Sequence, residues 1–235
     1  MTVYATLHLA DGRDRRDAVE VLFRTTMVGG NPMPFFLDGL DDYTEFCIDW
    51  YFTAPGGAVV VAIDDDVIVG YALVCTDPVA YGRHVRRATL ALTVRTACRL
   101  VTGRLDADSR RFYRDRARDS WRIWRKRARI DIVDEAHAHL NVAANARRGT
   151  VAAMLIEAID NVVRNAGHDA WVGEVNGEAN KRRRALERIV GIVLDEQPNV
   201  TASRLVGRPI VRYTVRRTVK LPVDSATNFA ITAQE

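Results

Sequence analysis

Several features that would place the chain in a special class are scarce or missing. Its three cysteines, Cys47, Cys75 and Cys98, are scattered through apolar stretches without metal-ligand spacing, which indicates reduced core residues and neither a zinc site nor a disulfide framework. No apolar run reaches the length of a membrane span. Residues 1–16 hold charges where a signal peptide needs an apolar run, so we expect a cytoplasmic protein.

Lysine is nearly absent as well, because the 34 basic residues include only Lys126, Lys181 and Lys220. The net charge of +4 hides an uneven distribution: residues 1–82 carry −9, residues 83–129 carry +12 and the remainder +1. A chain of 235 residues with 48% hydrophobic side chains can bury a full core. This length is typical of a single α/β domain with an insertion, and the basic middle block marks that insertion.

The most informative stretch runs from residue 137 to residue 167. His139 and Asn141 alternate with Leu140 and Val142, which predicts a strand with two different faces. A helical stripe follows, ending before a glycine, and its apolar residues are Val151, Met154, Leu155, Ala158, Ile159 and Val162. The turn between them enters a helix whose first amides have no intrahelical partners, which favours binding of an anion such as a pyrophosphate.

This arrangement resembles motif A of the GCN5-related N-acetyltransferases (GNAT superfamily), whose signature is Q/R-x-x-G-x-G/A. The corresponding residues are Arg147, Arg148, Gly149, Thr150, Val151 and Ala152. The opening arginine and the final small residue agree with the signature, whereas Thr150 replaces its middle glycine. Residues 170–196 resemble the family's next unit, in which a strand, Asn176, a helix and Gly191 precede another strand.

The resemblance implies an α/β GNAT fold, with a central, mixed, mostly antiparallel twisted sheet of about seven strands flanked by helices. We expect residues 1–222 to form a single acyltransferase domain and residues 223–235 to form a tail. Ahead of the motif, the sequence predicts a helix near residues 41–53 whose aromatic residues pack in the core. It also predicts a hairpin with an acidic turn at residues 64–66, which we interpret as turn chemistry; no metal is expected.

Residues 78–129 form a predicted arginine-rich insertion between the third and fourth strands. Two helices are expected, near residues 79–102 and 106–126, with one apolar face packed on the domain and built from Leu90, Leu92, Val94, Leu100, Phe112, Tyr113, Trp121 and Trp124. A similar insertion before a His-x-His strand occurs in proteins related to the acetyltransferase-like C-terminal domain of O-GlcNAcase. Three interpretations stay open: solvated helices, capture of an anionic acceptor or of the coenzyme A 3′-phosphate, and nucleic-acid binding, which the neutral or acidic remainder disfavours.

By resemblance, the protein transfers the acetyl group of acetyl-CoA to an amine, by direct attack in a ternary complex. The acceptor would be an amine, and the basic insertion would favour an acceptor that also carries anionic groups. The protein would be a monomer or a homodimer. The cofactor-binding residues expected from the family are Leu140, Asn141, Val142, Arg147, Arg148, Gly149, Thr150, Val151, Ala152, Asn176 and Asn180.

Amine acylation needs a base for the ammonium, a donor for the oxyanion and an acid for the leaving thiolate. Glu174 and the two strand histidines, His137 and His139, are the candidate catalytic residues, and both histidines point to the same face of the strand. The family's tyrosine acid is replaced by Leu186 or Glu187. A catalytically weak or inactive acyl-CoA-binding module is therefore the alternative.

Overall fold

The computed structural model describes residues 3–7, 13–26, 31–130, 132, 134–146, 149–178 and 183–219. The strands are β1 (Val3–Leu7), β2 (Gly57–Asp64), β3 (Val67–Cys75), β4 (Ala136–Val142), β5 (Ala170–Glu178), β6 (Ile192–Pro198) and β7 (Ile210–Thr218). The helices are α1 (Arg13–Thr26), α2 (Leu40–Thr53), α3 (Pro78–Val101), α4 (Ala107–Ile130), α5 (Gly149–Asn165), α6 (Arg183–Ile189) and α7 (Val200–Val206), with a 3₁₀ turn η2 (Ala144–Ala146).

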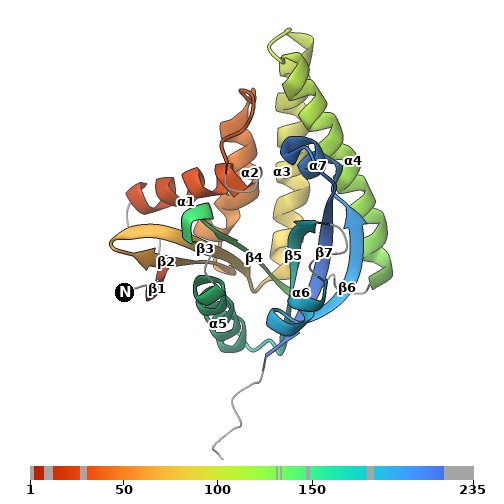
Figure 1. Ribbon diagram of the computed structural model, residues 1–235. Helices are drawn as coiled ribbons and strands as arrows, with labels where there is room; N and C mark the ends of the chain where they lie inside the picture. Colours follow the sequence, from red (N-terminus) through yellow and green to blue (C-terminus); the bar gives the residue numbers. More distant parts are fainter. Residues whose placement is uncertain are drawn as a thin grey trace, which may run out of the picture.

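The strands form one seven-stranded sheet in the order β1-β2-β3-β4-β5-β7-β6 (Figure 1). Every neighbouring pair is antiparallel except β4 and β5, which run parallel. The mixed, mostly antiparallel sheet expected from the sequence is confirmed. The hairpin of β2 and β3 turns at Asp65 and Asp66, whose φ values of 47° and 62° lie in the left-handed region that aspartate tolerates.

Helix α5 covers one face of the sheet through the apolar stripe expected for it. Val151, Leu155, Ala158 and Ile159 are buried in a cluster that includes Trp171 of β5. The helix begins at Gly149, ahead of the apolar stripe, and its first two residues, Gly149 and Thr150, are exposed. This packing holds the turn before α5 close to the end of β4.

Helices α1 and α2 cover the opposite face. Ile48, Trp50 and Tyr51 of α2 are buried against β2 and β3, which confirms the core interpretation of these side chains. Phe46 is only half-buried. The short helix α7, between β6 and β7, was not expected from the sequence; Asn199 begins it by accepting a hydrogen bond from the Ala202 amide at 3.0 Å, and Gly207 ends it in the left-handed conformation.

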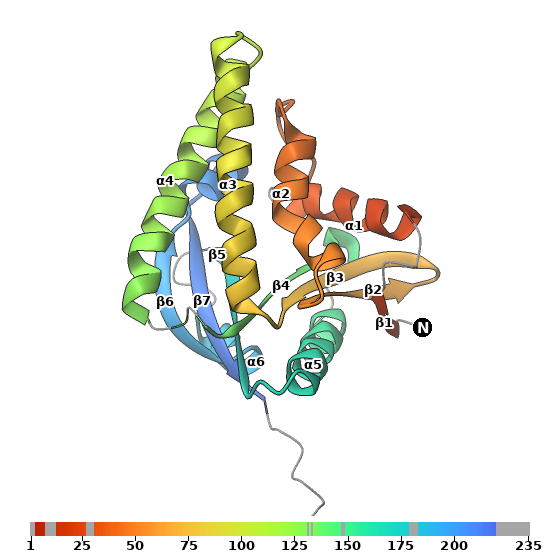
Figure 2. The same ribbon diagram turned by 180° about the vertical axis from the view of Figure 1, so that it is seen from behind.

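The insertion is a hairpin of two long helices on this same side of the molecule (Figure 2). Helix α3 packs beside α2, where Arg95 pairs with Asp42 at 2.8 Å and Arg99 pairs with the same carboxylate. Leu92, Phe112 and Tyr113 pack in a small cluster with Leu37 and Tyr43. The insertion therefore packs on the domain mainly through α2, α7 and the segment before α2.

One part of the predicted packing is wrong. The apolar residues of the insertion were expected on one buried face, yet five of them are exposed: Leu90, Val94, Leu100, Trp121 and Trp124. The sides of α3 and α4 that contact α2 and α7 carry polar contacts instead, among them half-buried Arg99 with Asp42 and buried Asp119 with Thr201. Cys98 is exposed on α3 as well, whereas Cys75 is buried and Cys47 half-buried.

No helix in the ranges described above has a stretch that is long and apolar enough to span a bilayer.

Candidate active site

The candidate site lies where β4 and β5 separate. These parallel strands pair at only three positions, Ala136 with Trp171, His137 with Val172 and Ala138 with Gly173. Beyond them β4 stays paired with β3 as far as Val142, while β5 stays paired with β7. The two strands thus present unpaired main-chain edges to each other, and an extended ligand with amide groups can hydrogen-bond to such an edge.

Gly173 lies at the point of separation. A Cβ atom there would lie 3.0 Å from the Trp171 ring and 3.1 Å from the Ala138 carbonyl oxygen, so a side chain would push the two strands apart. Glycine therefore lets β4 and β5 meet closely at the base of the opening.

The strand histidines point away from α5 and towards α2 and α3. Tyr51 lies with its phenolic oxygen 3.0 Å from Nε2 of His137, and the Tyr81 ring lies 4.3 Å from the His137 ring. The rings of His137 and His139 are 5.8 Å apart, on the same side of the strand as expected. Burial raises the pKa of Tyr51 well above its ordinary value, and the neighbouring Tyr81 adds to the effect, so the Tyr51 phenol stays protonated at neutral pH.

Glu174 shares a small pocket, of about 10 Å³, with both histidines. The pocket at the strand divergence is lined by Ile132, His137, His139, Val172, Gly173, Glu174 and Thr214. Arg212 of β7 lies behind it, with its Nε atom 3.4 Å from a carboxylate oxygen of Glu174. Burial lowers the pKa of Arg212, and the Glu174 carboxylate opposes that effect. The structure thus brings together all three residues proposed as catalytic.

Strand β4, which would face the cofactor, has main-chain groups available for hydrogen bonding. Leu140 and Val142 pack towards the α5 cluster, whereas Asn141 points the other way and donates a hydrogen bond to Tyr71 at 2.6 Å. Since these side chains are occupied within the protein, the main-chain groups of β4 are what an extended ligand would meet in the opening.

The start of α5 supplies the second part of the expected cofactor site. Gly149 and Thr150 are exposed, Ala152 is half-buried and Val151 packs in the core. A Cβ atom on Gly149 would meet nothing within 4 Å, so the fold itself does not require glycine there. Free amides of a first helical turn suit a phosphate. Arg147 and Arg148 lie outside the described residues.

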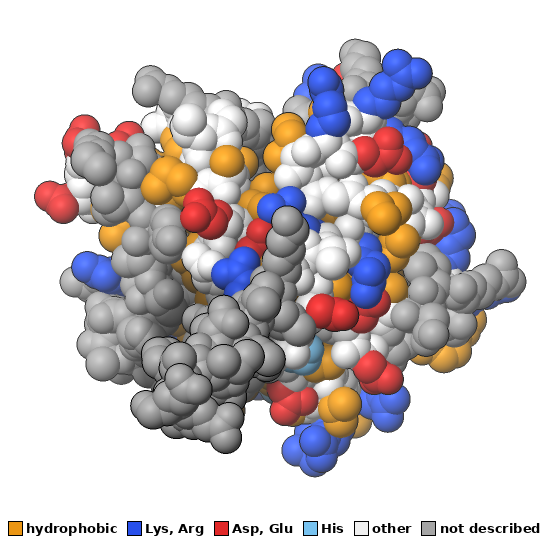
Figure 3. Space-filling view, turned by 90° about the horizontal axis from the view of Figure 1, so that it is seen from below, with side chains coloured by type: hydrophobic (Ala, Val, Ile, Leu, Met, Phe, Trp, Pro, Cys, Tyr) orange, Lys and Arg blue, Asp and Glu red, His pale blue; other side chains and the backbone are white. Residues whose placement is uncertain are grey.

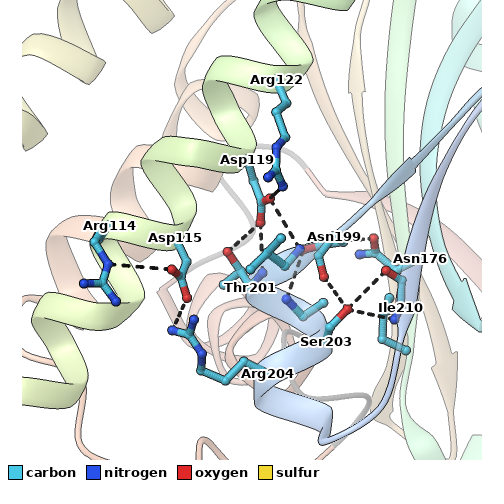
Figure 4. Close-up of polar contacts among 12 residues, drawn as sticks. Arg114, Asp115, Asp119, Arg122, Asn176, Asn199, Thr201, Ser203, Arg204 and Ile210 are labelled. Atoms are coloured by element: carbon cyan, nitrogen blue, oxygen red, sulfur yellow. Dashed lines mark hydrogen bonds and ion pairs between the residues drawn. The ribbon is translucent and has the colours of Figure 1, made fainter.

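Asn176 borders the opening from β5 and is held by a neighbour from the end of β6. Asn199 donates a hydrogen bond to the Asn176 side-chain oxygen at 2.9 Å (Figure 4). From the same segment, the Thr201 amide and hydroxyl donate to Asp119 of α4 at 2.9 and 2.7 Å. A chain of polar contacts therefore connects the insertion to the edge of the opening. Asn180 lies outside the described residues.

Sequence reasoning missed four residues around the pocket: Tyr51, Tyr81, Arg212 and Thr214. Tyr51 belonged to an aromatic group interpreted as core, and Tyr81 to the insertion. Tyr51 is indeed buried in the α2 cluster, and Tyr81 packs against the same cluster. The alternation of β7, in which Arg212 and Thr214 share a face opposite the buried Tyr213, is the signal that could have indicated the remaining two.

A larger pocket of about 300 Å³ lies further along the same side of the sheet. Three segments line it: the connection between α1 and α2, helix α4 and helix α7. Its lining residues are Pro34, Phe35, Asp108, Arg111, Phe112, Asp115, Thr201, Arg204 and Leu205. Asp115 is buried and pairs with Arg204, so the insertion and α7 form one wall together (Figure 4).

No family model and no curated protein matches the sequence. Solved structures do resemble the fold. A ribosomal-protein-alanine N-acetyltransferase from Brucella melitensis is 14% identical, with a TM-score of 0.50 over 92% of this chain and 99% of that one. A candidate phosphinothricin N-acetyltransferase is 12% identical, with a TM-score of 0.51 over 93% and 99%.

A GNAT superfamily phosphinothricin acetyltransferase from Sinorhizobium meliloti, solved with acetyl-CoA, is 14% identical, with a TM-score of 0.49 over 93% of this chain and 88% of that one. At these identities the similarity concerns architecture. The strand order, the single parallel pair and the extent of the matches together show that the chain has the fold of the GCN5-related N-acetyltransferases.

Proposed function

We propose that this protein is an acyl-CoA-dependent N-acyltransferase that moves the acetyl group of acetyl-CoA to an amine in a ternary complex. The observation that carries the proposal is the opening between β4 and β5, which has unpaired strand edges, His137, His139 and Glu174 beside it, and the start of α5 close by. We further propose a cytoplasmic location and one domain over residues 1–222.

The cofactor would lie along the opening. Its pantetheine amides would pair with the main chain of residues 140–142, its pyrophosphate would meet the first amides of α5, and Asn176 would position the arm from the other side. A fold shared with acetyltransferases and the exposure of Gly149 and Thr150 support this placement. Arg147, Arg148 and Asn180 retain the roles that the resemblance implies.

The chemistry requires proton removal from the attacking ammonium. His139 or His137 would take this proton directly or through water, since an imidazole accepts a proton near neutral pH. Glu174, held by Arg212, is the third candidate. The amine would then attack the thioester carbonyl and the thiolate would leave. A thiol has a reference pKa of about 8.5, so the thiolate leaves without a dedicated acid, though more slowly than with one.

We propose the larger pocket as the site of the acceptor. Phe35 and Phe112 offer apolar contacts, while Arg111 and Arg204 offer positive charge for a carboxylate or phosphate on the acceptor. In this proposal the insertion is a lid, since α4 supplies one wall of the pocket and Tyr81 of α3 contacts His137. A closer relationship to the O-GlcNAcase-related branch is consistent with the insertion and the His-x-His strand.

The second candidate function is a non-catalytic acyl-CoA-binding module. Its support is the helix after Asn176, where Leu186 is buried in the core and Glu187 is exposed and paired with Arg183, so neither replaces the family's tyrosine acid. Calorimetry with acetyl-CoA tests the binding that both functions share. Release of free thiol in the presence of a panel of amines then separates them: amine-dependent release supports the transferase, and binding without any release supports the module.

A further inference from the structure

Acidic and basic residues are segregated on helix α4. Its two acidic residues in the middle of the helix, Asp115 and Asp119, are buried on the inner side and contact α7. Between residues 110 and 125 the exposed side chains are Arg110, Arg111, Arg114, Ala117, Arg118, Ser120, Trp121, Arg122, Trp124 and Arg125. This stretch, which we call the α4 outer face, thus exposes six arginines and no acidic residue.

Two tryptophans lie in the middle of the α4 outer face. Trp121 and Trp124 stack on each other with ring centroids 5.0 Å apart and an interplanar angle of 29°. They are 59% and 66% exposed, although tryptophan is usually among the more buried residues. In the described part of the chain, neither ring belongs to a buried hydrophobic cluster. A stacked aromatic pair in water is a platform that another flat group can extend.

The arginines flank this platform along the helix axis. Arg114, Arg118, Trp121 and Arg125 follow one another at spacings of four, three and four residues, which places them on one side of an α-helix. The stretch from residue 110 to residue 125 is about 22 Å long at ~1.5 Å per residue. Guanidinium groups bind phosphate in bidentate fashion and also stack on aromatic rings. The insertion uses arginine almost to the exclusion of lysine, so its basic side chains are suited to both kinds of contact.

We propose that the α4 outer face binds single-stranded nucleic acid, with bases stacking on Trp121 and Trp124 and phosphates bound by the flanking arginines. Proteins that bind single strands without sequence preference combine these two elements, a positively charged track and aromatic stacking surfaces. This goes beyond the proposed acetyl transfer and does not depend on it, because Arg111 is the one residue of the α4 outer face that also lines a pocket, and the tryptophans and the other five arginines line neither pocket described above.

Other occupants fit the surface less well. A membrane-bound helix buries a broad apolar face, whereas this one offers only the two tryptophans and Ala117 between arginines. A second copy of the same face would oppose arginine with arginine. An acidic protein would satisfy the charges but would not require two stacked, solvent-exposed rings. The end of the molecule seen in Figure 3 shows acidic and basic side chains side by side, whereas the α4 outer face exposes only basic ones.

The protein carries its own reporter for this binding. Trp50 and Trp171 are buried, so the exposed fraction of the tryptophan fluorescence comes from Trp121 and Trp124. Titration of the full chain with a fluorescein-labelled oligouridylate of about twelve nucleotides, followed by anisotropy and by tryptophan quenching, measures association and stacking separately. We expect both signals to change together, and a log–log salt slope of about −2 if three arginines contact phosphate.

Matched variants decide whether the α4 outer face is the site. Trp121→Ala and Trp124→Ala should each weaken binding by about fivefold or more, while Leu90→Ala, which removes an exposed apolar side chain from α3, should not. Arg118→Gln and Arg15→Gln each remove one exposed positive charge, and only the former should weaken binding. Trp121→Phe should retain part of the affinity. Because these side chains are exposed, thermal unfolding should be unchanged.

Three results would overturn the proposal. These are no association with the oligonucleotide at low salt, association that is unaffected by both tryptophan substitutions, and tighter binding to phosphatidylglycerol vesicles or polyglutamate than to the oligonucleotide. The last result would assign the surface to a membrane or to an acidic protein. Acetyl-CoA binding, measured by calorimetry on the same variants, should be unaltered, so a failure of the proposed acetyl transfer would be seen separately.

Discussion

The phenolic oxygen of Tyr51 lies 3.0 Å from Nε2 of His137, joining α2 to β4 across the face of the sheet. We expect Tyr51→Phe to leave the ring packing in place while His137 loses a partner that fixes its orientation. Stability should fall by about 1 kcal/mol, and the turnover rate by about tenfold, with unchanged acetyl-CoA affinity. Steady-state kinetics and calorimetry measure these quantities.

The control for Tyr51→Phe is Tyr113→Phe. It removes a hydroxyl that donates to the Asp38 carbonyl oxygen at 2.8 Å, away from the histidines. If both variants lose turnover equally, the loss does not arise from the contact of Tyr51 with His137, and this contact has no specific role in catalysis.

The ion pair of Glu174 and Arg212 allows catalytic and structural roles to be separated. Glu174→Gln leaves the buried Arg212 guanidinium without its carboxylate, so we expect a loss of about 3 kcal/mol in the free energy of unfolding. The double variant Glu174→Gln/Arg212→Gln should recover much of that stability. Activity that returns with stability would show that Glu174 is structural, whereas stable but inactive protein would support its role as a base.

Gly149 should matter for the cofactor and little for the fold. A side chain at this position meets no neighbouring atom within the protein, but it would obstruct a phosphate at the start of α5. We expect Gly149→Ile to weaken acetyl-CoA binding more than tenfold in calorimetry. Gly82→Ile, another position with open space around the Cβ atom, is the control. Equal affinity of the Gly149 variant and the wild type would remove the motif assignment.

The variant Asp119→Ala tests whether the insertion acts as a lid over the acceptor site. The Asp119 carboxylate accepts hydrogen bonds from Thr201 and, at 3.3 Å, from the Val200 amide, so Asp119→Ala should cost about 3 kcal/mol of stability. If α4 forms a wall of the acceptor site, the acceptor KM should rise while acetyl-CoA affinity is retained. Asp17→Ala, which removes an exposed carboxylate from α1, is the control. An unchanged acceptor KM in the Asp119 variant would contradict the lid.

Stability should fall at alkaline pH. Burial raises the pKa of Cys47 to about 11, and it raises the pKa of Cys75 and of Tyr113 to about 12. Since the folded state holds these protons more tightly, their contribution is complete below the ordinary pKa values and is lost as pH rises towards 11 and 12. Each group contributes a slope of about −1.4 kcal/mol per pH unit in that range. Denaturant unfolding of Cys47→Ala should show a shallower decline between pH 9 and 11; an identical decline would refute the assignment.

The sequence was sufficient for the parts of the fold that depend on local pattern. The two-residue alternation around His139 and the helical stripe from Val151 correctly predicted β4 and α5. It was insufficient where side chains from distant segments meet. Tyr51 and His137 are 86 residues apart, and nothing in either segment indicates their contact.

The insertion shows the same limit in another form. Its helices were placed nearly correctly, but apolar side chains alone did not reveal which side is buried. Asp115 and Asp119 occupy the inner side of α4, because their contacts with Arg204 and Thr201 satisfy charges that would otherwise be costly to bury. The tryptophans consequently lie outside, which a rule based on hydrophobicity does not predict.

The side chain of Asn199 makes two hydrogen bonds: its oxygen accepts one from the Ala202 amide at the start of α7, and its nitrogen donates one to Asn176. A displacement of α7 by a molecule bound against α4 must therefore either move Asn176 or break one of these bonds. Binding of the cofactor and binding of the acceptor would then be coupled. The factor by which the cofactor changes the affinity for the acceptor must equal the factor by which the acceptor changes the affinity for the cofactor.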